Sequence, residues 1–170
     1  INATSANYAT ITSILTSGGN NSNFDANGDG VISIGEVRAV ETLKLDASQV
    51  SSLNDFSDFY AMTSLKNLYI NYNGGTRTED INLTGLQNCS KLEIVWFYNA
   101  TAEDYSYLAR VKKLTHLIFY SINDDDLARI CGTDDAGKGI NEYDLKNLQY
   151  FGVVGNTDYA DDKNATDIAS

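Results

Sequence analysis

The sequence predicts an α/β solenoid of about five repeats, with short parallel strands on its concave face and helical or 3₁₀ returns on its convex side. One observation is that the pattern apolar-x-x-apolar-x-apolar occurs five times, with starts 25, 27, 22 and 34 residues apart. A second is that apolar residues at three-residue spacing follow the pattern, as a helical return requires. The five copies are Val40-Leu43-Leu45, Leu65-Leu68-Ile70, Leu92-Val95-Phe97, Leu114-Leu117-Phe119 and Leu148-Phe151-Val153.

Composition limits the classes of function that suit this chain. Its 170 residues are 42% hydrophobic, which is enough for a packed core, and its longest apolar runs are far too short to span a bilayer. The formal net charge is −11, and no lysine or arginine cluster appears along the sequence. Such a surface repels phosphate backbones, so we expect no nucleic-acid partner. The chain has no initiator Met, so we expect it to begin after a removed signal or within a longer protein.

Residues 1–39 lack the repeat and are expected to form an N-terminal cap, because the first repeat of a solenoid has no neighbour on its outer side. Tyr8, Ile11, Ile14 and Leu15 have helical spacing and predict a short helix, which residues 18–21 should end. A polar loop and a brief helix from Ile34 to about Ala39 should then lead into the solenoid, residues 40–170.

The repeats differ in the segment that follows each strand. The third is the most regular, and its return should bury Tyr105, Leu108 and Val111. The corresponding apolar residues are Val50, Leu53, Phe56, Phe59 and Met62 in the first repeat, and Ile81, Leu83 and Leu86 after a Gly74-Gly75 insertion in the second. The fourth carries an insertion around residues 131–139 that we expect to protrude as a loop. The fifth breaks off after Asp167-Ile168, before its return is complete.

Two cysteines do not make a disulfide framework. Cys89 lies three residues before Leu92, an inward position of the repeat, so a buried thiol is the simpler interpretation. A disulfide between Cys89 and Cys131 is the alternative.

Residues 25–36 match a twelve-residue calcium loop at every demanding position. Calcium prefers six to eight oxygen ligands, and a glycine at position 6 makes the sharp turn. The glycine here is Gly30, and Ile32 should pack inward. The expected ligands are Asp25, Asn27 and Asp29 through their side chains, Val31 through its carbonyl, Ser33 directly or through water, and Glu36 through both carboxylate oxygens.

This loop resembles that of the EF-hand family, which implies Ca²⁺ as a cofactor. Residues 18–23 should break the entering helix, and no second loop is present, so a constitutive, structural ion is expected rather than a sensor. The alternative is an Asx/Gly-rich turn that binds no ion. The loop also resembles half of a dockerin, but that family needs two loops and more often ends them in Asp.

The strand positions that point away from the core carry an unusual number of aromatic side chains. In a strand these positions alternate with the buried ones. A contiguous apolar patch rich in Tyr and Trp is typical of an interaction site. We therefore expect a ligand-binding field formed by Tyr69, Trp96, Tyr98, His116, Ile118, Tyr120 and Tyr150. Alternatively, the insertion after Ile130 or a second copy covers the field, or its rings only stabilise the sheet.

Catalysis is not expected. The chain has a single histidine, and we find no nucleophile elbow, paired metal-binding histidines or glycine-rich phosphate loop. His116 is interpreted as part of the aromatic field. The run Asp124-Asp125-Asp126 suggests a metal or an acid pair, but the register favours a solvated turn with Asp126 beside a buried Leu127.

From about residue 37 to 170 the repeats resemble the leucine-rich repeat family, in particular its bacterial cell-surface branch that includes the internalins. Asn73 and Asn156 occupy the family's asparagine position, whereas Ser48, Ala100 and Ile122 replace it in the other repeats. The resemblance implies a secreted or cell-surface module that binds an extracellular protein or glycan and is not an enzyme. The alternative is a structural or spacer segment of a larger surface protein, or a self-associating module, with no ligand of its own.

Overall fold

The computed structural model describes residues 11–15, 24–46, 49, 55–72, 80–132, 139–140 and 145–155. Several predicted features lie outside this part of the chain: Tyr8, residues 16–23, Ser48, Val50, Leu53, Asn73, the Gly74-Gly75 insertion, residues 133–138, Asn156 and the Asp167-Ile168 end of the fifth repeat.

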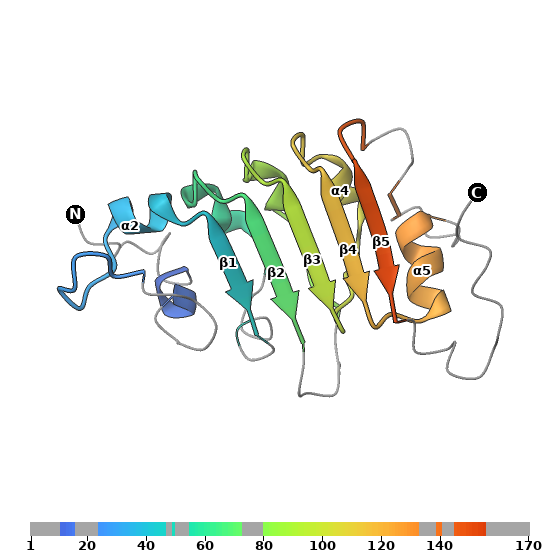
Figure 1. The fold of residues 1–170 in the computed structure, drawn as a ribbon, viewed down its shortest axis with the longest axis horizontal. Helices are drawn as coiled ribbons and strands as arrows, with labels where there is room; N and C mark the ends of the chain where they lie inside the picture. Colours follow the sequence, from blue (N-terminus) through green and yellow to red (C-terminus); the bar gives the residue numbers. More distant parts are fainter. Residues whose placement is uncertain are drawn as a thin grey trace.

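Five short parallel strands form one sheet in which each strand pairs with the next along the chain (Figure 1). They are β1 (Thr42–Leu45), β2 (Asn67–Asn71), β3 (Ile94–Tyr98), β4 (His116–Tyr120) and β5 (Tyr150–Val154). Each strand contains the last two apolar residues of one sequence pattern. The parallel strands predicted from that pattern are therefore confirmed, and no described strand pairs with the outer edge of β1 or of β5.

One register runs through all five strands. The row Thr42, Asn67, Ile94, His116 and Tyr150 occupies aligned positions, and every later row keeps the same offset. No bulge shifts the pairing, so residues at the same place in the repeat stack side by side and face the same side of the sheet.

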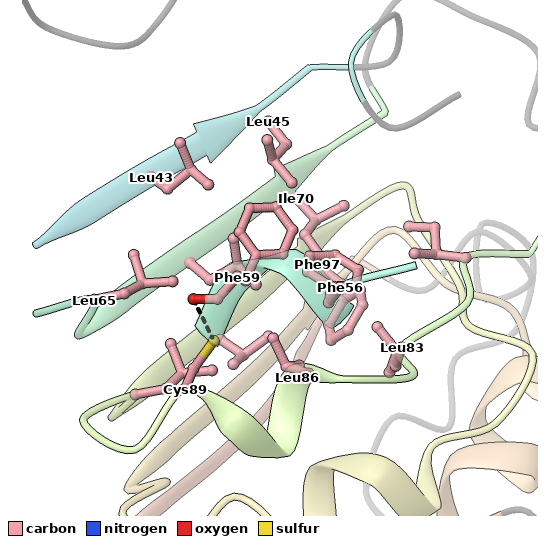
Figure 2. Packing of buried hydrophobic residues seen from close by; sticks show 14 of the residues in the cluster. Leu43, Leu45, Phe56, Phe59, Leu65, Ile70, Leu83, Leu86, Cys89 and Phe97 are labelled. Atoms are coloured by element: carbon pink, nitrogen blue, oxygen red, sulfur yellow. Dashed lines mark hydrogen bonds between the residues drawn. The ribbon is translucent and has the colours of Figure 1, made fainter. Parts of the chain in front are cut away.

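The core lies on one face of this sheet. The inward residues of β1 to β4 are at most 1% exposed: Leu43, Leu45, Leu68, Ile70, Val95, Phe97, Leu117 and Phe119. Figure 2 shows Leu45 of β1 near Ile70, and Leu43, Phe56, Phe59 and Phe97 belong to the same core. Phe97 and Phe119 stack with ring centroids 5.0 Å apart. Full burial of such side chains stabilises the fold by about 1.5–3 kcal/mol each.

Short helices return the chain on the core side of the sheet. They are the 3₁₀ helices η1 (Ser57–Ala61) and η2 (Leu86–Asn88) and the α-helices α4 (Ser106–Ala109) and α5 (Asp124–Cys131). The predicted inward residues of these returns are buried where they are described: Phe56, Phe59, Met62, Ile81, Leu83, Leu86, Tyr105, Leu108 and Val111. Three-residue spacing therefore identified the return faces correctly.

The N-terminal residues join the same core as the strands. Residues 11–15 are helical, and α2 spans Ile34–Ala39 as the sequence predicts. Ser33 and Glu36 form a capping box, in which each side chain accepts a hydrogen bond from the other residue's backbone N–H. The buried apolar residues of this region are Ile11, Ile14, Leu15, Ile32 and Val37. This shared core is consistent with a cap, which remains a prediction.

The aspartate run differs from its prediction. Asp124 and Asp125 are exposed in the first turn of α5, but Asp126 is only 1% exposed and Leu127 is half-buried. Asn123 caps this helix, and the Asp126 carboxylate accepts a hydrogen bond from Arg129 Nη2 at 2.8 Å. The prediction of a solvated turn was wrong, because the fourth repeat forms a longer helix. In this helix Asp126 faces inward and pairs with Arg129 three residues later.

Arg129 extends this network to the neighbouring repeats. Its Nη1 donates to the Asp80 carboxylate, which also accepts a hydrogen bond from Thr101 Oγ1. The hydrogen bonds of Arg129 to Asp80, first, and to Asp126 hold the pKa of its guanidinium group above its usual range. The buried Tyr105 lies nearby, and its hydroxyl accepts a hydrogen bond from Ala102 N at 3.0 Å. Polar contacts thereby join the returns of the second, third and fourth repeats through Asp80, Thr101 and Arg129.

The fifth strand is buried less than the others. Phe151 occupies an inward position, yet it is 41% exposed, and Val153 is only partly buried. Phe151 contacts Phe119 at a centroid separation of 6.0 Å, while its other side has no strand beside it in the described part of the chain. The apolar pattern located this strand correctly, but burial also needs a neighbour on both sides.

The two cysteines are free, so the disulfide alternative is not supported. Cys89 is buried as expected, and its Sγ contacts the Phe59 carbonyl oxygen at 3.6 Å (Figure 2). Burial raises the pKa of the Cys89 thiol to about 12. Cys131 is exposed at the end of α5.

Among the described residues, no helix is long and apolar enough to cross a membrane.

Gly85 provides a sharp test of how the returns stack. Its φ is +93°, and a Cβ there would lie 2.4 Å from the backbone of Ser57 in the preceding return. We expect Gly85→Ala to lower the free energy of unfolding by about 2 kcal/mol or more, because it combines a left-handed backbone with a backbone clash. Urea denaturation measures this change.

Gly35→Ala is the matched control, since its Cβ would meet only Ser33 Oγ at 3.7 Å. Gly35 is an exposed position of α2, where alanine favours the helix, so this variant should raise the free energy of unfolding by up to about 1 kcal/mol. Equal effects of the two substitutions would contradict the close packing of the returns.

Candidate functional site

The expected aromatic field lies on the sheet face opposite the core. Burial alternates along β2, β3 and β4, with half-buried residues between fully buried ones. Six of the predicted field residues occupy these intervening positions: Tyr69, Trp96, Tyr98, His116, Ile118 and Tyr120. The seventh, Tyr150, is aligned with His116 on β5 and is exposed. We call this surface the open face.

Register brings the field residues together in cross-strand contacts. The Tyr98 and Tyr120 rings stack with centroids 4.9 Å apart and an interplanar angle of 10°. Tyr69 and Trp96 are adjacent at 5.9 Å with tilted rings. Because aromatic pairs at such separations attract each other beyond their burial, the rings hold one another in place. The open face is thus a preformed surface.

The first three strands form a groove on the open face. Its volume is about 570 Å³, and its lining consists of Thr42, Lys44, Tyr69, Ile70, Asn71, Trp96 and Tyr98. Three of the predicted residues line this groove. Thr42, Lys44 and Asn71 were missed as site residues, although they occupy the same outward offsets, because the selection favoured aromatic side chains.

Polar groups border the groove on the β1 side. Lys44 Nζ lies 5.9 Å from the centroid of the Tyr69 ring, within reach of a cation–π interaction. Asn67 Nδ2 donates to Thr42 Oγ1 at 3.0 Å. The groove therefore offers ring faces, a cation and amide or hydroxyl groups, which can hold an apolar surface and orient a polar one.

The rest of the field lies beyond the groove, over β4 and β5. The His116 and Tyr150 rings stack at 6.0 Å, and His116 Nδ1 is 2.9 Å from Thr115 Oγ1. Tyr150 lies against its own strand, since a Cβ at Gly152 would be 2.7 Å from the Tyr150 ring. His116 thus belongs to the aromatic surface, aligned between Ile94 of β3 and Tyr150 of β5.

The backbone of the predicted metal loop is left-handed at two of its glycines. Gly28 and Gly30 have φ of +72° and +81°. The Asp25 carboxylate accepts hydrogen bonds from three backbone N–H groups, those of residues 28, 29 and 30, at 2.7–3.1 Å. Asp29 Oδ1 accepts one from Val31 N at 2.8 Å. The carboxylates of Asp25 and Asp29 therefore turn toward the loop backbone.

Glu36 closes the loop from its far end. Its Oε1 accepts from Ala26 N at 2.8 Å, and its Oε2 accepts from Ser33 N at 2.8 Å. These hydrogen bonds, first of all those with Ser33, lower the pKa of the Glu36 carboxyl group. Because its pKa is lower in the folded state, Glu36 contributes stability at neutral pH that is lost as the pH falls through the folded-state pKa. Ile32 packs inward at 6% exposure, as predicted.

The loop residues fit calcium in ligand chemistry and backbone path. Asp25, Asn27, Asp29 and Glu36 all lie within one short loop, and their oxygens accept N–H groups within it. In the described part of the chain, no three His, Cys, Asp or Glu side chains lie close enough together to hold a metal ion as they stand. An ion would therefore share these oxygens with the backbone donors and draw the carboxylates together.

Comparison with known proteins gives limited likeness. No protein-family model matches the sequence, and no curated protein matches it. A solved structure of an internalin, inlF from Listeria monocytogenes, is similar with a TM-score of 0.32 and 14% sequence identity. The match covers 87% of this chain and 56% of that protein, so the chain spans just over half of its length.

Trp96, the single tryptophan, reports directly on the open face. Tyr69→Ala removes the ring 5.9 Å away, so we expect red-shifted emission and stronger acrylamide quenching as the indole gains contact with water. Tyr60→Ala, which removes an exposed ring in η1, should leave both signals unchanged. Identical spectra for the Tyr69 variant and the wild type would contradict the Tyr69–Trp96 contact.

Proposed function

We propose that this chain is a secreted or cell-surface recognition module of the leucine-rich repeat type, and that it acts as a binding surface rather than as an enzyme. Its ligand is an extracellular protein or glycan held on the open face. The observation that carries the proposal is the groove of about 570 Å³, lined by Tyr69, Trp96 and Tyr98 with Lys44 at its border.

Preorganisation supports this proposal. The field residues stand on strands paired in one register, and stacked neighbours such as Tyr98 and Tyr120 already restrict their side chains. Binding then costs less side-chain entropy than it would on a flexible loop. Aromatic residues in the centre of an interface commonly contribute most of its affinity.

Binding to a glycan microarray and to a panel of purified extracellular proteins tests the proposal. A ligand found in this way should bind the double variant Trp96→Ala/Tyr120→Ala at least about tenfold more weakly, since interface hot-spot residues commonly contribute more than 1 kcal/mol each. Tyr60→Ala should bind normally, because Tyr60 lies in η1 outside the field.

A second variant separates binding from folding. Lys44→Ala/Asn71→Ala alters the groove border without removing an aromatic pair of the sheet centre. Reduced affinity with an unchanged melting temperature supports recognition at the groove. Unchanged affinity in both double variants would assign the ligand to another surface.

A spacer function is the alternative, and the stacking of Tyr98 on Tyr120 favours it, because such rings also stabilise a sheet. Suppose that Trp96→Ala/Tyr120→Ala unfolds the chain while Lys44→Ala/Asn71→Ala changes neither affinity nor melting temperature. The aromatic field then serves to stabilise the sheet, and the spacer function is preferred.

We further propose that Ca²⁺ occupies the loop of residues 25–36. Asp25, Asn27, Asp29, Val31, Ser33 and Glu36 would hold it. The loop leads directly into α2, which ends one residue before Val40, so an ion here would stabilise the first end of the sheet. Affinities near 10⁻⁴–10⁻³ M, typical of extracellular modules, would keep the site occupied outside the cell.

Thermal unfolding with and without chelator tests this site. Calcium should raise the melting temperature of the wild type by several degrees, because a ligand of the folded state stabilises it by mass action. Glu36→Gln should abolish that rise, whereas Glu103→Gln, in another part of the chain, should keep it. A wild-type melting temperature that does not respond to calcium would disprove the proposal.

A further inference from the structure

The same turn precedes strands β2 to β5, and it carries lysine in three successive repeats. The backbone N–H groups of Leu65, Leu92, Leu114 and Leu148 each donate to the carbonyl oxygen three residues earlier, at 3.0–3.1 Å. The two central residues of the last three turns are Ser90-Lys91, Lys112-Lys113 and Lys146-Asn147. All six of these residues are exposed.

Parallel pairing places these turns along one edge of the sheet. The backbone N–H groups of Glu93, Thr115 and Gln149 each donate to the carbonyl of the equivalent residue in the preceding repeat, at 2.8 Å. Neighbouring strands lie about 4.8 Å apart, so successive turns follow one another at about that interval. We call Lys91, Lys112, Lys113 and Lys146 the lysine ridge.

The lysine ridge is a positively charged region on a chain whose net charge is negative. The chain has a formal net charge of −11, and the fold brings Lys91 and Lys146 beside the adjacent pair Lys112-Lys113, from positions up to 55 residues apart in the sequence. Among the described residues none of the four forms an ion pair, whereas Lys66, which lies between the first turn and β2, pairs with Glu41 at 3.0 Å. Cations this close together act jointly at physiological ionic strength, where the screening length is about 8 Å.

Two hollows flank the ridge, and hydrogen-bonding groups line them. One, of about 420 Å³, is lined by Glu93, Lys113, Thr115, Lys146, Asn147, Leu148 and Gln149. The other, of about 210 Å³, is lined by Ala109, Val111, Lys112, Leu114, Leu145, Lys146 and Asn147. Lys146 and Asn147 border both hollows, so a ligand that crosses their turn meets cations and polar groups on each side, together with one carboxylate, that of Glu93, in the larger hollow.

We propose that the lysine ridge binds a linear anionic polysaccharide lying across the strands. A polymer with regularly spaced sulfate or carboxylate groups suits cations repeated from turn to turn, and its hydroxyl groups suit the amide and hydroxyl side chains of the hollows. Single-stranded nucleic acid fits less well, because neither hollow is lined by an aromatic ring on which bases could stack. This site is separate from the open face and does not depend on it.

Fluorescence anisotropy with labelled oligosaccharides tests the ridge. The probes are a sulfated heparin fragment, an oligogalacturonate, a neutral dextran fragment of similar length and a single-stranded oligonucleotide. An anionic oligosaccharide should bind, should lose affinity as salt rises from about 0.05 to 0.3 M, and should bind Lys113→Gln/Lys146→Gln at least about tenfold more weakly. The dextran should not bind.

Two controls locate the binding. Lys44→Gln/Arg38→Gln removes two charges outside the ridge turns, and Lys44→Ala/Asn71→Ala alters only the groove border of the open face. Both variants should therefore still bind the anionic probe. Loss of binding in the open-face variant, binding that Lys113→Gln/Lys146→Gln does not weaken, or no binding of either anionic oligosaccharide would overturn the proposal. Equal or tighter binding of the oligonucleotide would overturn the choice of polysaccharide.

Discussion

The rest of this structure depends on the unbroken register of its parallel strands. Each strand hydrogen-bonds to the next with no shift, so every position of the repeat forms a row across the sheet. A slip of one residue would turn the buried leucines and phenylalanines outward and the field residues inward. Burial of the inward rows opposes such a slip, because several apolar side chains would lose their core contacts at once.

Because of that register, three parts of each repeat form three different surfaces or layers of the molecule. Its inward rows form the core, its outward rows form the aromatic field, and the turns before the strands form the lysine ridge. Each surface repeats at the strand interval of about 4.8 Å. An extended ligand could therefore contact equivalent groups from several repeats, whether it lies on the open face or along the edge.

Contacts between the returns complete the stack on the core side. Gly85 allows the backbones of the first two returns to approach closely, and Phe56 N donates to the Thr84 carbonyl oxygen at 2.8 Å. Farther along, Arg129 joins Asp80 to the buried Asp126. A buried aspartate is costly unless it is paired, so this arginine satisfies a requirement that the fold itself creates. These polar contacts connect repeats of unequal length that apolar packing alone would leave less well aligned.

The apolar pattern by itself determined the strands, their inward residues and most of the returns, because alternation and three-residue spacing are local properties of the chain. The same offsets identified the field residues, and Gly30 indicated the sharp turn of the loop. Tertiary structure decided what depends on neighbours: the burial of Asp126, the exposure of Phe151 and the groove bordered by Thr42 and Lys44. It also decided the lysine ridge, because residues far apart in the sequence become neighbours only when successive turns stack.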